Sequence, residues 1–168
     1  MADIDDMAYD WDEDDEDATA DRYLLFQVAE EQYGIPISHV LEIVGVQKTT
    51  EVPEMPHYVK GVINLRGQVL PVADVRLRFG LDERDYDDRT CMIVVQLDEI
   101  RVSLVVDRVS EVITIPEADV SAPPAVQRSA AGRFIMGMAR VGDEVKILLD
   151  VNKLLYDGDV QTLAAATA

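Results

Sequence analysis

Apolar residues along this chain alternate with polar ones in short runs, and glycine, proline or charged residues follow most of these runs. Period-two runs bounded by turn residues predict short β-strands. The expected strands are Arg22–Val28, Tyr33–Ile37, Tyr58–Leu65, Gln68–Ala73, Cys91–Leu97, Arg101–Val106, Val112–Ile115, Phe134–Val141 and Glu144–Leu149. Many short strands with frequent turns are typical of small β-barrels and not of a parallel α/β sheet.

Three short segments carry helical signals instead. Within Ser38–Val44, apolar side chains recur three and four residues apart and the first residue can cap a helix, so we expect one or two helical turns. Asp74 precedes a helical piece at Val75–Phe79, and Asp150 precedes another at Val151–Tyr156. These two carboxylates fit helix caps better than an acid–base pair.

The body of the chain contains an internal repeat. A shift of 69 residues aligns 35–44 with 104–113, and a shift of 76 aligns Gly61 with Gly137 and Asp74 with Asp150. Ordered matches of this kind predict two copies of one β-barrel unit, at about 22–80 and 90–156. The expected fold class is therefore mainly β, with two barrels in tandem and short helices.

The charge of the chain is strongly negative and unevenly spread. Its 168 residues include 33 acids and 15 bases, a formal net charge of −18, and residues 1–21 hold eleven of the acids and no base. Such a field repels phosphate backbones and anionic lipid, so we expect no nucleic-acid partner. Abundant Asp and scarce Lys favour a halophilic protein, adapted to high salt, and an ordinary protein with an acidic tail is the alternative.

The segment 1–21 is predicted to be a disordered acidic tail, because like charges extend a chain that has no apolar face. Asp10, Asp12 and Asp14 have the spacing of calcium-loop ligands, but Asp15 stands where that loop requires glycine, so we expect no metal there. Residues 158–168 are expected to form a flexible C-terminal tail. No run approaches the roughly 18 apolar residues of a membrane span, which predicts a cytoplasmic protein without membrane insertion.

Residues that would build an active site are scarce. Cys91 is the single cysteine, so an intrachain disulfide and a four-thiolate zinc site are excluded. His39 and His57 lack neighbours at the usual metal-ligand spacing, and the common catalytic and nucleotide-binding motifs are missing. We expect a protein-binding module without cofactor or catalysis; the alternative is a small-molecule- or metal-binding β-barrel.

Two stretches resemble the chemotaxis coupling proteins of the CheW family. One combines Tyr23-Leu-Leu-Phe-Gln-Val with Gln32-Tyr-Gly-Ile-Pro-Ile; the other is Val59-Lys-Gly-Val-Ile-Asn-Leu-Arg-Gly-Gln-Val-Leu-Pro-Val-Ala-Asp-Val-Arg, which matches the family's IKGVxNLRGxxxPxxDLR string with Val59 and Val75 as mild departures. The resemblance extends over about residues 22–157. It implies two SH3-like five-stranded barrels and an adaptor that couples methyl-accepting chemoreceptors to the histidine kinase CheA, so that receptor state controls kinase autophosphorylation.

The resemblance also implies which residues contact each partner. The implied receptor-binding residues are Ile37, Val40, Glu42, Ile43, Lys60, Gly61 and Arg66, and the implied kinase-binding residues are Val44, Gly45, Val46, Lys48 and Thr49. The family pairs Glu42 with Arg66, and a guanidinium between apolar strands requires such a carboxylate. We expect this ion pair to be partly buried, with a structural purpose first. The free protein is expected to be a monomer that joins membrane-bound receptor arrays.

Overall fold

The structure, a computed structural model, describes residues 21–122 and 130–156. Its elements in chain order are β1 (Arg22–Val28), β2 (Glu31–Pro36), η1 (Ile37–His39), β3 (Val40–Gly45), β4 (Val59–Leu65), β5 (Gln68–Asp74), α3 (Val75–Arg78), β6 (Cys91–Leu97), β7 (Ile100–Val106), β8 (Arg108–Thr114), η2 (Glu117–Asp119), β9 (Val120–Ser121), η3 (Ala130–Phe134), β10 (Ile135–Val141), β11 (Glu144–Leu149) and α4 (Val151–Tyr156). The expected disorder of residues 1–20 and flexibility of residues 158–168 lie outside the described residues. Within the described residues, no helix is long and apolar enough to cross a membrane.

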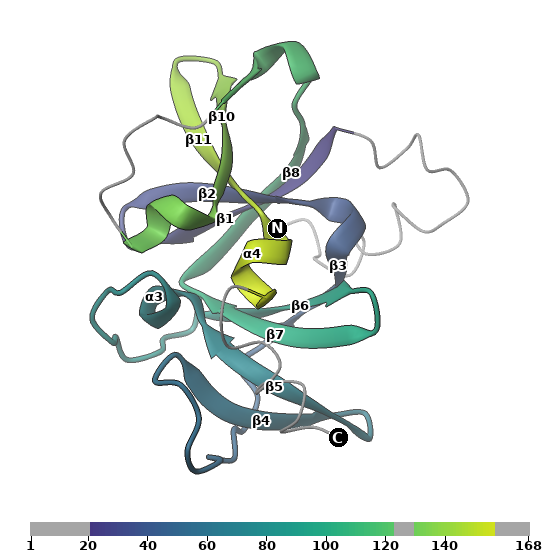
Figure 1. Ribbon diagram of the computed structural model, residues 1–168, viewed down its shortest axis with the longest axis vertical. Helices are drawn as coiled ribbons and strands as arrows, with labels where there is room; N and C mark the ends of the chain where they lie inside the picture. The colour runs from purple at the N-terminus through teal and green to yellow at the C-terminus, as the bar shows by residue number, and fades with distance from the viewer. Residues whose placement is uncertain (1–20, 123–129, 157–168) are drawn as a thin grey trace.

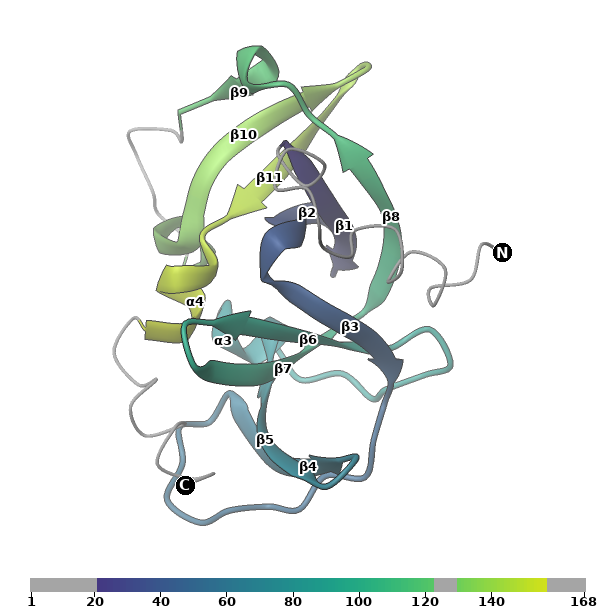
Figure 2. The same cartoon turned by 90° about the vertical axis from the view of Figure 1, so that its right-hand side faces the viewer.

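The strands form two sheets, one above the other in Figure 1 and seen from the side in Figure 2. One sheet has six strands in the order β8-β1-β2-β11-β10-β9, and the other has five in the order β3-β6-β7-β5-β4. Neighbouring strands are antiparallel except for one parallel pair in each sheet, β2 with β11 and β5 with β7. The mainly β class expected from the alternating pattern is confirmed.

Each sheet takes strands from both copies of the repeat. The repeat relates β1-β2-β3-β4-β5-α3 to β6-β7-β8-β10-β11-α4. The β1–β2 hairpin nevertheless pairs with β8 and β11 of the second copy, and the β6–β7 hairpin pairs with β3 and β5 of the first. The two copies have exchanged their first hairpins, so the sheets do not divide the chain at 22–80 and 90–156 as expected. The alternation of apolar and polar residues predicts each hairpin, but it does not determine which sheet the hairpin joins.

Equivalent residues of the two copies make the same contacts. The carboxylates of Asp74 and Asp150 accept hydrogen bonds from the backbone N–H three residues ahead, at 3.3 and 3.2 Å, and so cap α3 and α4 as predicted. The backbone N–H of Asp74 donates to the Tyr58 carbonyl, and that of Asp150 donates to the Phe134 carbonyl, both at 2.8 Å. These matching bonds support the repeat that was inferred from sequence.

The segment 38–44 does not form the helix that its spacing predicted. The single turn η1 leads instead into strand β3, whose pairing with β6 contains one extra residue, Leu41. The extra residue is a β-bulge, because Val40 and Glu42 face consecutive residues of β6. The bulge turns Val40 and Ile43 to the same buried face although they are three residues apart, and this imitates a helical period.

One large apolar core joins the two sheets. It includes Phe26 and Ile35 from the six-stranded sheet, Ile93 and Leu104 from the five-stranded sheet, and Leu154 from α4. Removing apolar side chains from water is the main term that stabilises such a fold. The two sheets therefore share one core and form one packed domain. The strands and turns at its surface hold the residues of the candidate site.

Candidate functional site

Arg66 lies in the tight turn that joins β4 to β5. Both turn residues have positive φ angles, 51° at Arg66 and 87° at Gly67, which match the twist of a two-residue hairpin. The side-chain oxygen of Asn64 accepts a hydrogen bond from the Gly67 N–H at 2.9 Å. The Asn-Leu-Arg-Gly segment thus places the base of the Arg66 side chain at a defined position on the hairpin tip.

The Arg66 guanidinium forms an ion pair with the Glu42 carboxylate of strand β3. Nη1 donates to Oε2 at 2.6 Å and Nη2 donates to Oε1 at 2.5 Å, which is a bidentate geometry. The hydrogen bonds from Arg66 hold the pKa of Glu42 below its ordinary value. The Arg66 side chain is 68% exposed and the Glu42 side chain 27%. The two residues do meet, but the expected burial of Arg66 is wrong, because the hairpin tip stands out from the sheet.

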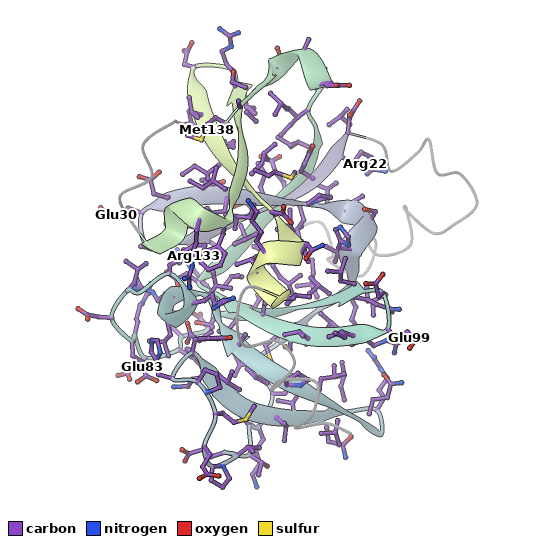
Figure 3. All side chains as sticks on the ribbon, in the orientation of Figure 1. Arg22, Glu30, Glu83, Glu99, Arg133 and Met138 are labelled. Atoms are coloured by element: carbon purple, nitrogen blue, oxygen red, sulfur yellow. The ribbon has the colours of Figure 1, made fainter. Side chains whose placement is uncertain are left out.

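Two further residues of the expected receptor surface lie on β4. Lys60 forms an ion pair with Glu83, which belongs to the connector between α3 and β6 (Figure 3). Gly61 is buried with φ of 139°, and a Cβ atom there would lie 2.0 Å from the Thr50 carbonyl oxygen. Gly61 therefore permits two backbones to approach closely, and it offers no side chain to a partner.

Three residues expected on the receptor surface belong to the core. Ile37, Val40 and Ile43 are at most 6% exposed and pack in the apolar core between the sheets. Their assignment to a binding surface is therefore corrected, because a partner cannot reach side chains buried in the core. An apolar side chain that β3 does expose is Leu41, at 40%. The bulge turns Leu41 outward. Apolar residues in 38–44 follow neither a strict strand period nor a strict helix period, and this irregular spacing was the sequence feature that indicated a bulge.

The expected kinase-binding residues run from the end of β3 into the loop before β4. Gly45, Val46 and Lys48 are exposed, whereas Val44 and Thr49 are half-buried. The next residue, Thr50, pairs with Val62 of β4 through two backbone hydrogen bonds of 2.8 Å. This strip, residues 44–49, is therefore anchored at both ends and presents Val46 and Lys48 at the surface.

Sequence reasoning missed an open groove of about 630 Å³ next to the Arg66 turn. Its lining includes Val69 of β5 and Ile100 and Arg101 of β7. Arg101 donates to the side-chain oxygen of Gln68 at 2.7 Å, which joins the two walls. Glu99 lies at the β6–β7 turn, at one end of these strands in Figure 3. The signal that could have found the groove is Val69, an apolar residue on an outward-facing position of its strand.

The buried carboxylate next to α3, that of Asp74, is already used by the fold. Asp74 caps α3 and accepts a hydrogen bond from the Tyr86 hydroxyl at 2.8 Å. Burial and this hydrogen bond raise the pKa of Tyr86 above its ordinary value. Among residues 21–122 and 130–156, no three His, Cys, Asp or Glu side chains are placed to hold a metal ion. The exposed Glu42–Arg66 pair can bind a polar or charged surface of another protein.

Comparison with known proteins identifies the family. The model of the CheW-like domain matches residues 22–159. The chain belongs to the CheW family. It is 35% identical to the chemotaxis protein CheW of Klebsiella aerogenes over 133 residues, which cover 79% of this chain and 80% of that one. It is 34% identical to the chemotaxis protein CheW of Treponema pallidum over 145 residues, covering 84% and 85%.

A solved structure of a CheW protein has the same fold. The scaffolding protein TtCheW from Thermoanaerobacter tengcongensis matches with a TM-score of 0.74 and 35% identity, over 81% of this chain and 92% of that one. As a member of the CheW family, the chain is a non-enzymatic coupling adaptor of chemotaxis signal transduction. The CheW-like match includes both sheets and both residues of the exposed ion pair.

Proposed function

We propose that this CheW-family domain joins the cytoplasmic tips of methyl-accepting chemoreceptors to the histidine kinase CheA, so that receptor state controls kinase autophosphorylation. The observation that carries the proposal is the exposed bidentate pair of Glu42 and Arg66. Ion pairs in such exposed positions stabilise a fold by only about 0–1 kcal/mol. A pair aligned in this way at the surface is better explained by a partner than by folding.

The receptor contact is proposed on the outer face of β3 and on the adjoining β4–β5 turn. Leu41 supplies exposed apolar area, and Glu42 and Arg66 supply charges of both signs beside it. Lys60 adds a cation on β4. An amphipathic helical tip can bury apolar area against such a surface while the charges fix its register.

The kinase contact is proposed on the strip 44–49. Val46 is 40% exposed there and Lys48 is exposed beside it, so the strip combines an apolar contact with a cation. The strip continues directly from β3, and the receptor contact uses the beginning of the same strand. One strand would then present both partner surfaces, with the receptor at its first residues and the kinase beyond its last.

The sheets are proposed to close as two SH3-like barrels. The bonds between Thr50 and Val62 join the loop after β3 to β4, and these two strands are the edges of the five-stranded sheet. In the six-stranded sheet the edge strands β8 and β9 follow one another through η2. Closure of this kind removes free strand edges, which suits an adaptor that is monomeric and cytoplasmic until it enters a receptor array.

A reconstituted kinase assay tests the proposed function. Autophosphorylation of CheA is measured with receptor-tip vesicles and this protein, and then with each component left out. The adaptor should raise autophosphorylation only when receptors are present. Arg66→Ala should weaken receptor binding about tenfold, which is 1.4 kcal/mol, whereas the exposed control Arg140→Ala should not. An adaptor that stimulates the kinase equally without receptors would contradict the proposal.

Adaptation to high salt is proposed from the charge alone. A formal net charge of −18 repels itself at low ionic strength, and salt screens that repulsion. Far-UV circular dichroism and denaturation during dialysis from molar salt to ~10 mM, where the screening length is roughly 30 Å, measure the effect. Stability should fall as salt is removed, and an unchanged free energy of unfolding would contradict this adaptation without touching the adaptor function.

A further inference from the structure

The last residue of α3, Arg78, is a buried cation between the two sheets. It is 6% exposed, and its guanidinium carbon lies 4.4 Å from the ring centre of Tyr58 and 4.8 Å from that of Phe134. Tyr58 directly precedes β4 of the five-stranded sheet, and Phe134 directly precedes β10 of the six-stranded sheet. The negative faces of both rings attract the cation, so one side chain holds the aromatic residue that leads into a strand of each sheet.

Hydrogen bonds tie the same guanidinium to α4. Nε donates to the Leu154 carbonyl at 3.1 Å, and Nη2 donates to the Lys153 carbonyl at 3.4 Å. Helix α4 follows β11 of the six-stranded sheet, whereas α3 follows β5 of the five-stranded sheet. The negative end of α4 therefore faces a cation fixed to the other sheet. In Figures 1 and 3, α4 lies at the level between the two sheets.

The second copy of the repeat has an ordinary apolar core residue at the position that corresponds to Arg78. The shift of 76 residues relates Arg78 to Leu154, which is 4% exposed in the apolar core, and relates Tyr58 to Phe134. A leucine thus suffices to fill the corresponding space in the second copy. Apolar contact has no preferred direction, so Leu154 can pack in many orientations. The planar guanidinium of Arg78 contacts two rings and two carbonyls at once, and only one relative position of these groups satisfies all four contacts.

We propose that Arg78 is a positioning residue that fixes the orientation of one sheet against the other, and through it the receptor surface. This rests on the proposed function. Strand β3 follows β2 of the six-stranded sheet through η1 alone, so a helical tip docked on Leu41 and Glu42 lies close to the boundary between the sheets (Figure 2). The kinase strip 44–49 ends at its bonds to β4, within the five-stranded sheet. Both contacts use the five-stranded sheet, but the start of β3 adjoins the six-stranded sheet and the end of β3 does not (Figure 2). Orientation of the sheets should therefore matter to the receptor and not to the kinase.

Distances between spin labels test the positioning directly. Val69→Cys on β5 and Val145→Cys on β11 place one exposed label on each sheet, in a Cys91→Ser background of the full chain. The wild-type arginine should give one narrow distribution of distances. Arg78→Leu should give a broader or displaced distribution, and the control Arg108→Leu, at an exposed arginine of β8 away from both labels, should keep the narrow one. Equal distributions for Arg78→Leu and the control would overturn the proposal.

Binding measurements test the consequence, using the unlabelled variants, a soluble receptor tip and the CheA regulatory domain. Arg78→Leu should bind the receptor tip about tenfold more weakly, while its affinity for the kinase domain stays within about twofold. Loss of receptor affinity without a change in label distances would overturn the proposal, and so would changed distances with full receptor affinity. If Arg78→Leu does not fold, Arg78→Lys replaces it; failure of both to fold would show a merely structural residue. If the wild-type chain binds no receptor tip, the proposed function fails while the label distances still decide the positioning.

Discussion

Two arginine–carboxylate pairs of this domain have the same chemistry in opposite surroundings. The Arg76 Nε atom lies 3.1 Å from Asp107 Oδ1, and these side chains are 17% and 13% exposed. Asp107 also accepts hydrogen bonds from the Ala29 N–H at 2.8 Å and from Arg84 at 3.3 Å. The Glu42–Arg66 pair has better bidentate geometry, but its arginine side chain is 68% exposed.

The difference between the pairs separates folding from recognition. Asp107 lies where the chain passes from β7 to β8, and its partners come from the β1–β2 turn, from α3 and from the connector after α3. It therefore links both sheets, and water cannot easily replace a lost partner there. Either member of the Glu42–Arg66 pair can be hydrated when the other is removed, which leaves that pair available to a partner protein.

The largest effect is expected from Asp107→Ala. The substitution leaves two arginine side chains and the Ala29 N–H without their shared acceptor, and breaking an enclosed pair of this kind costs about 3–5 kcal/mol. That loss is a large part of the ~5–15 kcal/mol that stabilises a typical domain. Urea denaturation in molar salt measures it.

Asp107→Asn is the matched control for the charge. The amide oxygen can still accept from the backbone of Ala29, so this variant should lose less stability than Asp107→Ala. A loss below about 1 kcal/mol for Asp107→Ala would place this pair in the same class as surface pairs and remove the contrast.

Sequence patterns predicted the strands well and their assembly poorly. Arg22–Val28, Cys91–Leu97 and Glu144–Leu149 form strands with the expected bounds, because alternation along a single strand is a local property. The exchange of hairpins depends on contacts between distant parts of the chain, and no local pattern encodes it. Asp107 was missed for the same reason, since its bond to Ala29 joins residues 78 positions apart.

The candidate site also divides into features that the sequence predicts and features that depend on the folded structure. The pairing of Glu42 with Arg66 could be predicted from a motif, but the exposure of Arg66 depends on how far its hairpin tip stands out from the sheet. Ile37, Val40 and Ile43 were assigned to the surface from the family resemblance, but all three are buried: Ile37 in the turn η1, and Val40 and Ile43 on one face of the bulged strand β3. The strand bulge was the feature that sequence reasoning did not resolve.

Arg66→Ala should cost little stability, at most about 1 kcal/mol, because its partner stays hydrated. Glu42→Ala should behave in the same way, and the double variant should recover a coupling energy of roughly 0.3–1 kcal/mol. Denaturation of the wild type, both single variants and the double variant measures this cycle. A coupling of several kcal/mol would mean that the exposed pair is structural after all.

Acid should erase the difference between wild type and Arg66→Ala. The pKa of Glu42 is lowered in the folded state by its hydrogen bonds to Arg66, so the pair stabilises the fold above the ordinary carboxyl pKa of about 4.3. This contribution is lost as pH falls through the lower pKa of the folded state. The free energies of unfolding of wild type and Arg66→Ala should therefore differ most near neutral pH and converge in strong acid. A difference that grows on acidification would contradict the assignment of the shift to Arg66.

The smallest expected effect is the response of the two pairs to salt. Raising ionic strength from 0.1 M to 1 M shortens the screening length from about 10 Å to about 3 Å, which weakens exposed charge pairs more than enclosed ones. The coupling energy of Glu42 with Arg66 should fall by a few tenths of a kcal/mol over this range, while that of Arg76 with Asp107 should stay nearly constant. Two double-mutant cycles at both salt concentrations measure the contrast, and comparison within each salt concentration removes the general effect of salt on this acidic chain. Equal salt responses would mean that exposure does not distinguish the pairs, and the assignment of one to folding and the other to recognition would lose its physical basis.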